Sequence, residues 1–126
     1  MDYLQWIDQN KDALIAAADE VWGFAELAFK EKQSATLLAN MMEEYGFRVT
    51  RGVAGIPTAF TAEYGSGGPV IGILGEYDAL PGLSQDRVPY VKPLTEEGNG
   101  HGCGHNLFGV ACVAAAATVK QAIEAG

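Results

Sequence analysis

Two side chains that commonly bind divalent metal ions, the thiol of Cys103 and the imidazole of His105, stand two residues apart in a glycine-rich turn. Glycine at positions 100, 102 and 104 lets the backbone turn tightly enough to direct both side chains toward one point. The apolar run 107–119 predicts a following helix, whose free N–H groups would favour a thiolate at Cys103. The pattern predicts a pair of metal ligands, while a thiol nucleophile paired with a histidine base is the competing interpretation.

Two acidic residues, Glu76 and Asp78, follow the apolar run 70–74, which predicts a strand buried on both faces. Ligands in α/β proteins gather just beyond the carboxyl ends of strands, where Asp78 is expected. There Asp78 could orient a metal-bound imidazole, or it could be an ordinary turn residue. Since two ligands do not suffice for catalytic zinc, the further ligands must be His101, Glu76 or Asp78, or residues outside these 126.

The bulk composition narrows the class of protein. The 126 residues are enough for one domain, and 48% hydrophobic residues exclude a disordered chain. A net charge of −8 argues against nucleic acid or an anionic membrane as a partner. The two cysteines suggest no disulfide, the first ten residues form no signal peptide, and the run 107–119 is too short for a membrane span. We therefore expect a cytoplasmic protein without a membrane partner.

Periodicity predicts an α/β fold with helices packed on a mixed sheet. Asp2, Ser34 and Asn106 are the expected N-caps of the three helices, Gly46 is expected to end the second, and Glu26 is expected to be a solvated charge. The expected elements are helices over 4–24, 34–45 and 107–124, strands over 47–51, 58–64 and 70–74, and an irregular segment over 82–104.

The predicted helix over 107–124 is apolar on nearly every side. A helix of this kind must be covered on all its faces. Two amphipathic helices and three short strands offer limited cover. We therefore expect residues 1–126 to be the N-terminal portion of a longer protein.

Two motifs, with their order along the chain, resemble the M20 peptidases, and within them the amidohydrolase and aminoacylase branch. Residues 76–81 read E-Y-D-A-L-P and residues 101–106 read H-G-C-G-H-N, where that branch carries D-M-D-A-L-P and H-G-C-G-H-D. The segment 26–35 is similar to the start of the family's domain. The fuller variants G-E-Y-D-A-L-P-G and G-H-G-C-G-H-N-L are similar to a subgroup that includes the second of the two p-aminobenzoyl-glutamate hydrolase subunits and dipeptidase-like proteins.

The resemblance implies a zinc-peptidase-like catalytic domain with two divalent ions, Zn²⁺ or Mn²⁺. Cys103 and His105 match the family's metal-ligand positions, and Asp78 matches its strand-end aspartate near the metals, so Asp78 is the expected catalytic residue of this chain. Glu76 stands where other branches have a metal-binding histidine and is not assigned as a ligand, while Asn106 replaces an aspartate. The catalytic glutamate, the remaining ligands and the dimerisation domain would lie outside residues 1–126, so this piece alone is expected to be inactive.

The implied reaction is metal-dependent hydrolysis of the amide bond of N-acyl or N-aroyl amino acids, such as p-aminobenzoyl-glutamate, or of small dipeptides. The full protein would be a homodimer or would pair with a related subunit. Two alternatives remain open: a cysteine-nucleophile enzyme that uses Cys103, and a non-catalytic or vestigial domain that binds a metal or a partner. Loss of activity on chelation would favour the metal enzyme over the first alternative.

Overall fold

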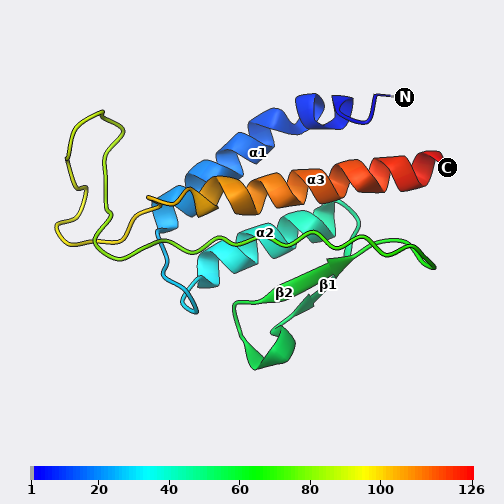
Figure 1. The fold of residues 1–126 in the computed structure, drawn as a ribbon, viewed down its shortest axis with the longest axis horizontal. Helices are drawn as coiled ribbons and strands as arrows, with labels where there is room; N and C mark the ends of the chain where they lie inside the picture. The colour runs from blue at the N-terminus through cyan, green and yellow to red at the C-terminus, as the bar shows by residue number, and fades with distance from the viewer. Residues whose placement is uncertain (1) are drawn as a thin grey trace.

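The computed structural model describes residues 2–126 and confirms the α/β class (Figure 1). Three helices carry most of the fold, and a two-stranded antiparallel sheet lies beside α2. In chain order the elements are α1 (Gln5–Phe24), α2 (Lys32–Glu44), β1 (Arg48–Arg51), the 3₁₀ turn Val53–Gly55, β2 (Phe60–Glu63) and α3 (His105–Ala125).

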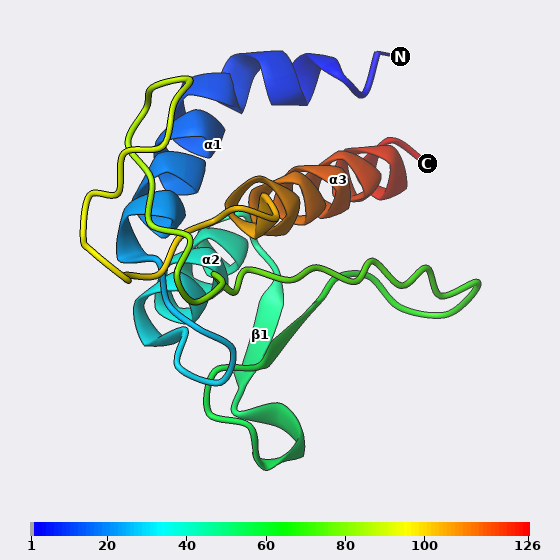
Figure 2. The same cartoon turned by 60° about the vertical axis from the view of Figure 1, so that its left-hand side comes forward.

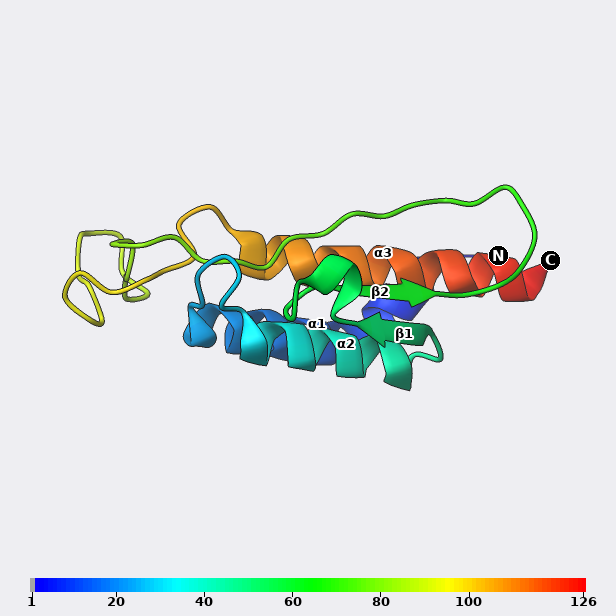
Figure 3. The ribbon, with the colours of Figure 1, turned by 90° about the horizontal axis from the view of Figure 1, so that it is seen from below.

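The core lies where α1, α2 and α3 meet (Figures 2 and 3). The amphipathic stripes of the helices provide it, as the 3.6-residue period predicts. Small residues on α1 and α3 let these two helices approach closely. The buried members are Leu14, Ala17, Ala18 and Val21 from α1, Leu38, Met41 and Met42 from α2, and Val110, Val113 and Ala114 from α3.

Helix α2 begins and ends with different capping interactions. At the C-terminal end Gly46 has a φ of +86°, and its N–H bonds to the Glu43 carbonyl while the Phe47 N–H bonds to the Met42 carbonyl. This pair of bonds is the Schellman motif, and it confirms the prediction for Gly46. At the N-terminal end the prediction was wrong, because Ser34 lies inside the helix and is fully buried.

Glu26 caps α2 in place of Ser34. Its carboxylate accepts the backbone N–H of Gln33 at 3.0 Å and of Ser34 at 2.8 Å, and the Ser34 hydroxyl at 2.9 Å. These are the free N–H groups that a helix start leaves unsatisfied. Burial raises the pKa of Glu26, but these hydrogen bonds outweigh it and hold the pKa below the usual 4.5. The expectation of a solvated charge was therefore wrong.

The hairpin β1–β2 follows the predicted alternation, with Arg48 opposite Glu63 and Arg51 opposite Phe60. The predicted third strand, over 70–74, does not form within residues 2–126. The segment is extended, but no strand lies beside it to complete its hydrogen bonds, and its apolar side chains are exposed, with Val70 at 88%. The described sheet is therefore an antiparallel hairpin and not the expected mixed sheet.

The extended segment after β2 instead runs back along α3, from its C-terminal end to its N-terminal end (Figure 3). Tyr64 donates a hydrogen bond to Glu124 near the end of α3, and the Cys112 thiol donates to the Leu74 carbonyl in its middle. Gly75 packs so closely on Cys112 that an added Cβ would lie 3.0 Å from the Cys112 Cβ. This course brings residues 76–78 to the first turn of α3.

Helix α3 begins two residues earlier than predicted, at His105, after Gly104 with a φ of +80°. Asn106 is therefore not its N-cap; the side chain is buried inside the first turn. Only one face of α3 is covered in the described chain, and Leu107 and Ile123 are 63% and 52% exposed. By length and composition alone, with a mean hydropathy of 1.4, α3 could cross a membrane, which for a single helix is weak evidence.

Candidate metal site

The segment that carries the acidic residues is held by backbone hydrogen bonds immediately after Asp78. The Ala79 N–H donates to the Glu26 carbonyl at 2.7 Å, and Leu27 and Ala79 form a parallel bridge. One residue later, Leu80 and Gly100 exchange two backbone hydrogen bonds, of 2.9 and 3.0 Å. An added Cβ at Gly100 would lie 1.9 Å from the Leu83 carbonyl oxygen, so this approach requires glycine.

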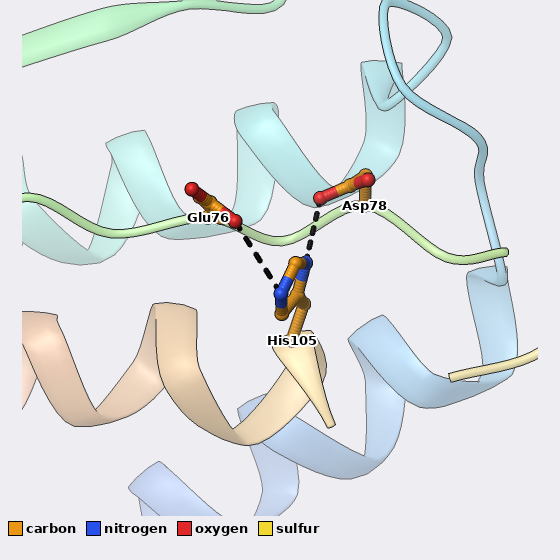
Figure 4. Close-up of side chains that lie close together, drawn as sticks. All are labelled: Glu76, Asp78 and His105. Atoms are coloured by element: carbon orange, nitrogen blue, oxygen red, sulfur yellow. Dashed lines mark hydrogen bonds and ion pairs between the residues drawn. The ribbon is translucent and has the colours of Figure 1, made fainter. Parts of the chain in front are cut away.

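Three side chains converge at the start of α3 (Figure 4). His105 Nδ1 lies 2.7 Å from Asp78 Oδ1, and His105 Nε2 lies 3.3 Å from Glu76 Oε2. The ligand atoms that the three residues offer all lie within 4.8 Å of one another. The His105 and Asp78 side chains are 19% and 24% exposed and Glu76 is 53% exposed, so the cluster opens to solvent on the Glu76 side.

The hydrogen bond to Asp78 determines what His105 can do. A carboxylate accepts hydrogen bonds, so it favours the proton on Nδ1 and leaves the Nε2 lone pair free. A metal-binding histidine is commonly oriented by a carboxylate in this way. The arrangement places Nε2 of His105 and the carboxylate of Glu76 3.3 Å apart, so a nitrogen and an oxygen donor face the same space.

The structure thus brings Asp78 and His105 together but leaves Cys103 outside their cluster. Cys103 is a free, exposed cysteine in the turn before α3, outside the group of three. Both ring nitrogens of His105 face carboxylates, so neither is paired with the Cys103 thiol in residues 2–126. Its role as a metal ligand stays a prediction. Glu76, left unassigned from the sequence, joins the cluster because it lies two residues from Asp78 on an extended segment, on the same side.

Two further residues hold the turn that carries Cys103 and His105. His101 Nε2 lies 3.0 Å from the Val21 carbonyl oxygen, and the Asn106 amide donates to the Ala18 carbonyl oxygen at 3.2 Å. Burial lowers the pKa of His101, although its hydrogen bond to Val21 acts in the opposite direction. His101 is therefore a packed residue of the turn, and its contacts do not place it in the cluster with Glu76.

A cavity of about 740 Å³ lies beside the cluster, between the C-terminal end of α1 and the irregular segment. Its walls include Trp22, Arg87 and His101, with the Arg87 guanidinium 5.4 Å from the centroid of the Trp22 ring. Neither His105 nor the two carboxylates of the cluster line it. The cavity and the group of three thus share no residue, although His101, Gly102 and Asn106 of the turn line the cavity.

Comparison with known proteins gives several relatives, although no family profile matches the chain. Over 94% of its length the chain is 48% identical to one of the subunits of p-aminobenzoyl-glutamate hydrolase of Escherichia coli strain K12. Over 94% of its length it is also 33% and 31% identical to the Xaa-Arg dipeptidases of Mus musculus and Homo sapiens. The chain spans about a quarter of the length of these relatives, 25% of the first and 26% of the other two.

Proposed function

We propose, from the premise that this chain belongs to the M20 family of peptidases and amidohydrolases, that it contributes metal ligands to an amide-bond hydrolase. The observation that carries the proposal is the convergence of Glu76, Asp78 and His105. A histidine and two carboxylates from two separate segments, with ligand atoms within 4.8 Å and open to solvent, place a metal-binding imidazole, the carboxylate that orients it and a second negative charge at one point.

The chemistry of the donors fits a divalent transition metal. An imidazole nitrogen and carboxylate oxygens suit Zn²⁺ and Mn²⁺, and a thiolate from the nearby Cys103 would favour Zn²⁺. Because these donors suit such a metal, we propose that His105 and Cys103 hold metal and that Asp78 orients His105. Two ions, as the family resemblance implies, would need ligands in addition to these residues.

Each residue has a distinct task in the proposed reaction. Asp78 holds the His105 ring through Nδ1, so the ring cannot rotate away from the site. Glu76, more exposed, adds negative charge at the mouth of the cluster. A bound metal supplies polarisation of the substrate carbonyl and acidification of a water molecule. We place the general base on a glutamate outside residues 1–126, as the resemblance implies.

The proposed substrates are N-acyl or N-aroyl amino acids, including p-aminobenzoyl-glutamate, and small dipeptides. The names of the relatives support this class, because one belongs to a p-aminobenzoyl-glutamate hydrolase and two others are Xaa-Arg dipeptidases. The first relative is named as a subunit, which supports a pair of related subunits, with a homodimer as the alternative. We expect the protein in the cytoplasm.

The direct test is Zn²⁺ and Mn²⁺ binding to this chain, measured by isothermal titration calorimetry. We expect His105→Ala to abolish binding, and Asp78→Asn and Cys103→Ser to weaken it about tenfold to a hundredfold. Cys112→Ser is the matched control, because that thiol lies along α3 and donates to the Leu74 carbonyl. A His105→Ala chain that binds metal as tightly as the wild type would refute the proposed site.

The reaction is tested on the complete protein, purified from its source, with p-aminobenzoyl-glutamate as the substrate. Chelation should abolish hydrolysis, and Zn²⁺ or Mn²⁺ should restore it. Hydrolysis that continues after chelation would instead favour the cysteine-nucleophile alternative. That alternative has no support from the contacts of Cys103, because no imidazole of residues 2–126 forms a hydrogen bond with its thiol.

A further inference from the structure

We infer that Asn106 and His101 are positioning residues that clamp the metal-site turn onto α1. The inference deepens the proposed function, on which it rests, by assigning the residues that fix His105 relative to Asp78. Neither residue touches the cluster in a way that would make it a ligand; each acts through the backbone of α1.

Both contacts join a side chain of the turn to a backbone carbonyl of α1. The Asn106 side chain donates to the Ala18 carbonyl at 3.2 Å, and the His101 ring bonds to the Val21 carbonyl at 3.0 Å. These carbonyls lie three residues apart, on neighbouring turns of the same face of α1. Ala18 and Val21 are themselves 5% and 0% exposed, so both anchor points belong to the core. The turn is therefore tied to the buried core of the molecule.

The clamp encloses the proposed ligands. His101 lies two residues before Cys103, and Asn106 immediately follows His105. Between the two contacts stand Gly102 and Gly104, whose backbones have the greatest conformational freedom of any residue. Without the clamp, such a turn would sample more conformations, so the two side-chain contacts restrict the backbone that carries His105, whose ring Asp78 then orients.

Asp78, the partner of His105 in the cluster, is also held in place by contacts close to the end of α1. Asp78 is followed by Ala79, whose N–H donates at 2.7 Å to the carbonyl of Glu26, two residues beyond the end of α1. Both partners of the 2.7 Å contact between Asp78 and His105 are therefore positioned from the C-terminal half of α1 and the segment that follows it. Helix α1 sets the geometry of a site to which it contributes no ligand.

Asn106→Leu tests the clamp, because leucine has a similar volume and no donor. The matched control is Val113→Ala, which removes buried volume from the same helix, α3, away from the turn. Three quantities are measured in the complete protein carrying each substitution: amide hydrogen exchange of 101–106, the His105 Nδ1–H signal by NMR, and Co²⁺ affinity from its visible spectrum. Urea unfolding gives the global stability of each variant.

We expect Asn106→Leu to speed exchange in the turn, to weaken the His105 Nδ1–H signal and to lower Co²⁺ affinity about tenfold. Val113→Ala should leave these three site properties unchanged at a comparable loss of stability. Equal effects in both variants, or no effect of Asn106→Leu, would overturn the inference, because the role of Asn106 would then be only that of a core residue.

A second pair of variants keeps the test decisive if Asn106→Leu does not fold. His101→Gln retains an N–H donor for the Val21 carbonyl, whereas His101→Leu does not. We expect the glutamine variant to preserve slow exchange in the turn and the leucine variant to lose it; identical behaviour would contradict the clamp. A complete wild-type protein that binds no Co²⁺ would contradict the proposed function, while hydrogen exchange and the Nδ1–H signal would still decide the inference.

Discussion

Removal of the Glu26 carboxylate should release the start of α2, although Glu26 lies outside that helix. Its two oxygens together accept the N–H groups of Gln33 and Ser34 and the hydroxyl of Ser34. Ser34 is fully buried, so neither its hydroxyl nor its N–H can turn to water when the carboxylate is absent. Glu26→Ala therefore removes a cap and leaves a buried polar group unpaired.

The expected cost follows from these two effects. Loss of a helix cap costs about 1–2 kcal/mol, and an unsatisfied buried hydroxyl costs about 1–3 kcal/mol. The Ser34 hydroxyl can rotate toward another acceptor, which would reduce the cost of leaving it unpaired. We therefore expect Glu26→Ala to lower the free energy of unfolding by about 2–4 kcal/mol. Glu26→Gln keeps one acceptor oxygen and should fall between this variant and the wild type.

The assay is urea unfolding followed by far-ultraviolet circular dichroism at pH 7. Glu20→Ala is the control, because Glu20 is an exposed glutamate of α1. A loss of less than about 0.5 kcal/mol in Glu26→Ala, the range of ordinary surface substitutions, would refute the capping argument.

The Glu26 carboxylate should also make the stability of the protein fall at acidic pH. The folded-state pKa of Glu26 lies below its usual 4.5, so below pH 4.5 the unfolded chain binds more protons than the folded chain. The contribution of Glu26 is therefore complete above pH 4.5 and is lost as the pH falls through the folded-state pKa. The difference in unfolding free energy between wild type and Glu26→Gln should shrink over that range; a constant difference would contradict the assignment.

Two other changes test the segments that lead into the site. Tyr77 donates a hydrogen bond from its hydroxyl to the Thr58 carbonyl. Burial raises the pKa of Tyr77 to about 12, and the charge of Glu31 is a smaller cause. Because the tyrosine of the unfolded chain ionises first, the wild type should lose stability between pH 10 and 12. Tyr77→Phe should remove this alkaline loss and cost about 1 kcal/mol at pH 7, as alkaline and neutral urea unfolding can measure. Gly100→Ala should cost at least about 3 kcal/mol in thermal unfolding, because its Cβ would meet backbone at 1.9 Å, whereas Gly72→Ala, with no atom within 4 Å, should cost less than about 1 kcal/mol.

The sequence alone predicted the elements whose signals are local. Apolar spacing along α1 and α2 reflects which face of a helix can be buried, and Gly46 ends α2 because only glycine adopts its positive φ without cost. Alternation located β1 and β2 within a residue or two. The spacing of Asp78 and His105 in their motifs singled out both members of the closest contact in the site.

Several predictions failed because their outcome depended on residues far along the chain. An apolar run such as 70–74 indicates that a segment can form a strand, but a strand also needs a partner, and none lies beside it in residues 2–126. Ser34 and Asn106 are good cap residues by type, yet one is buried in α2 and the other bonds to Ala18, 88 residues away. Local propensity cannot distinguish a cap from a buried contact, because the difference lies in what packs against it.

What the sequence by itself determined is the set of chemical groups, and the short spacings that keep Glu76 beside Asp78 and Cys103 beside His105. What only the tertiary structure decided is which of these groups meet. The course of the extended segment along α3 brings Glu76 and Asp78 to His105 and leaves Cys103 outside the cluster. The physical reason is that hydrogen bonds of about 3 Å depend on how whole elements pack, and that packing is set by the shared core and not by neighbours in the sequence.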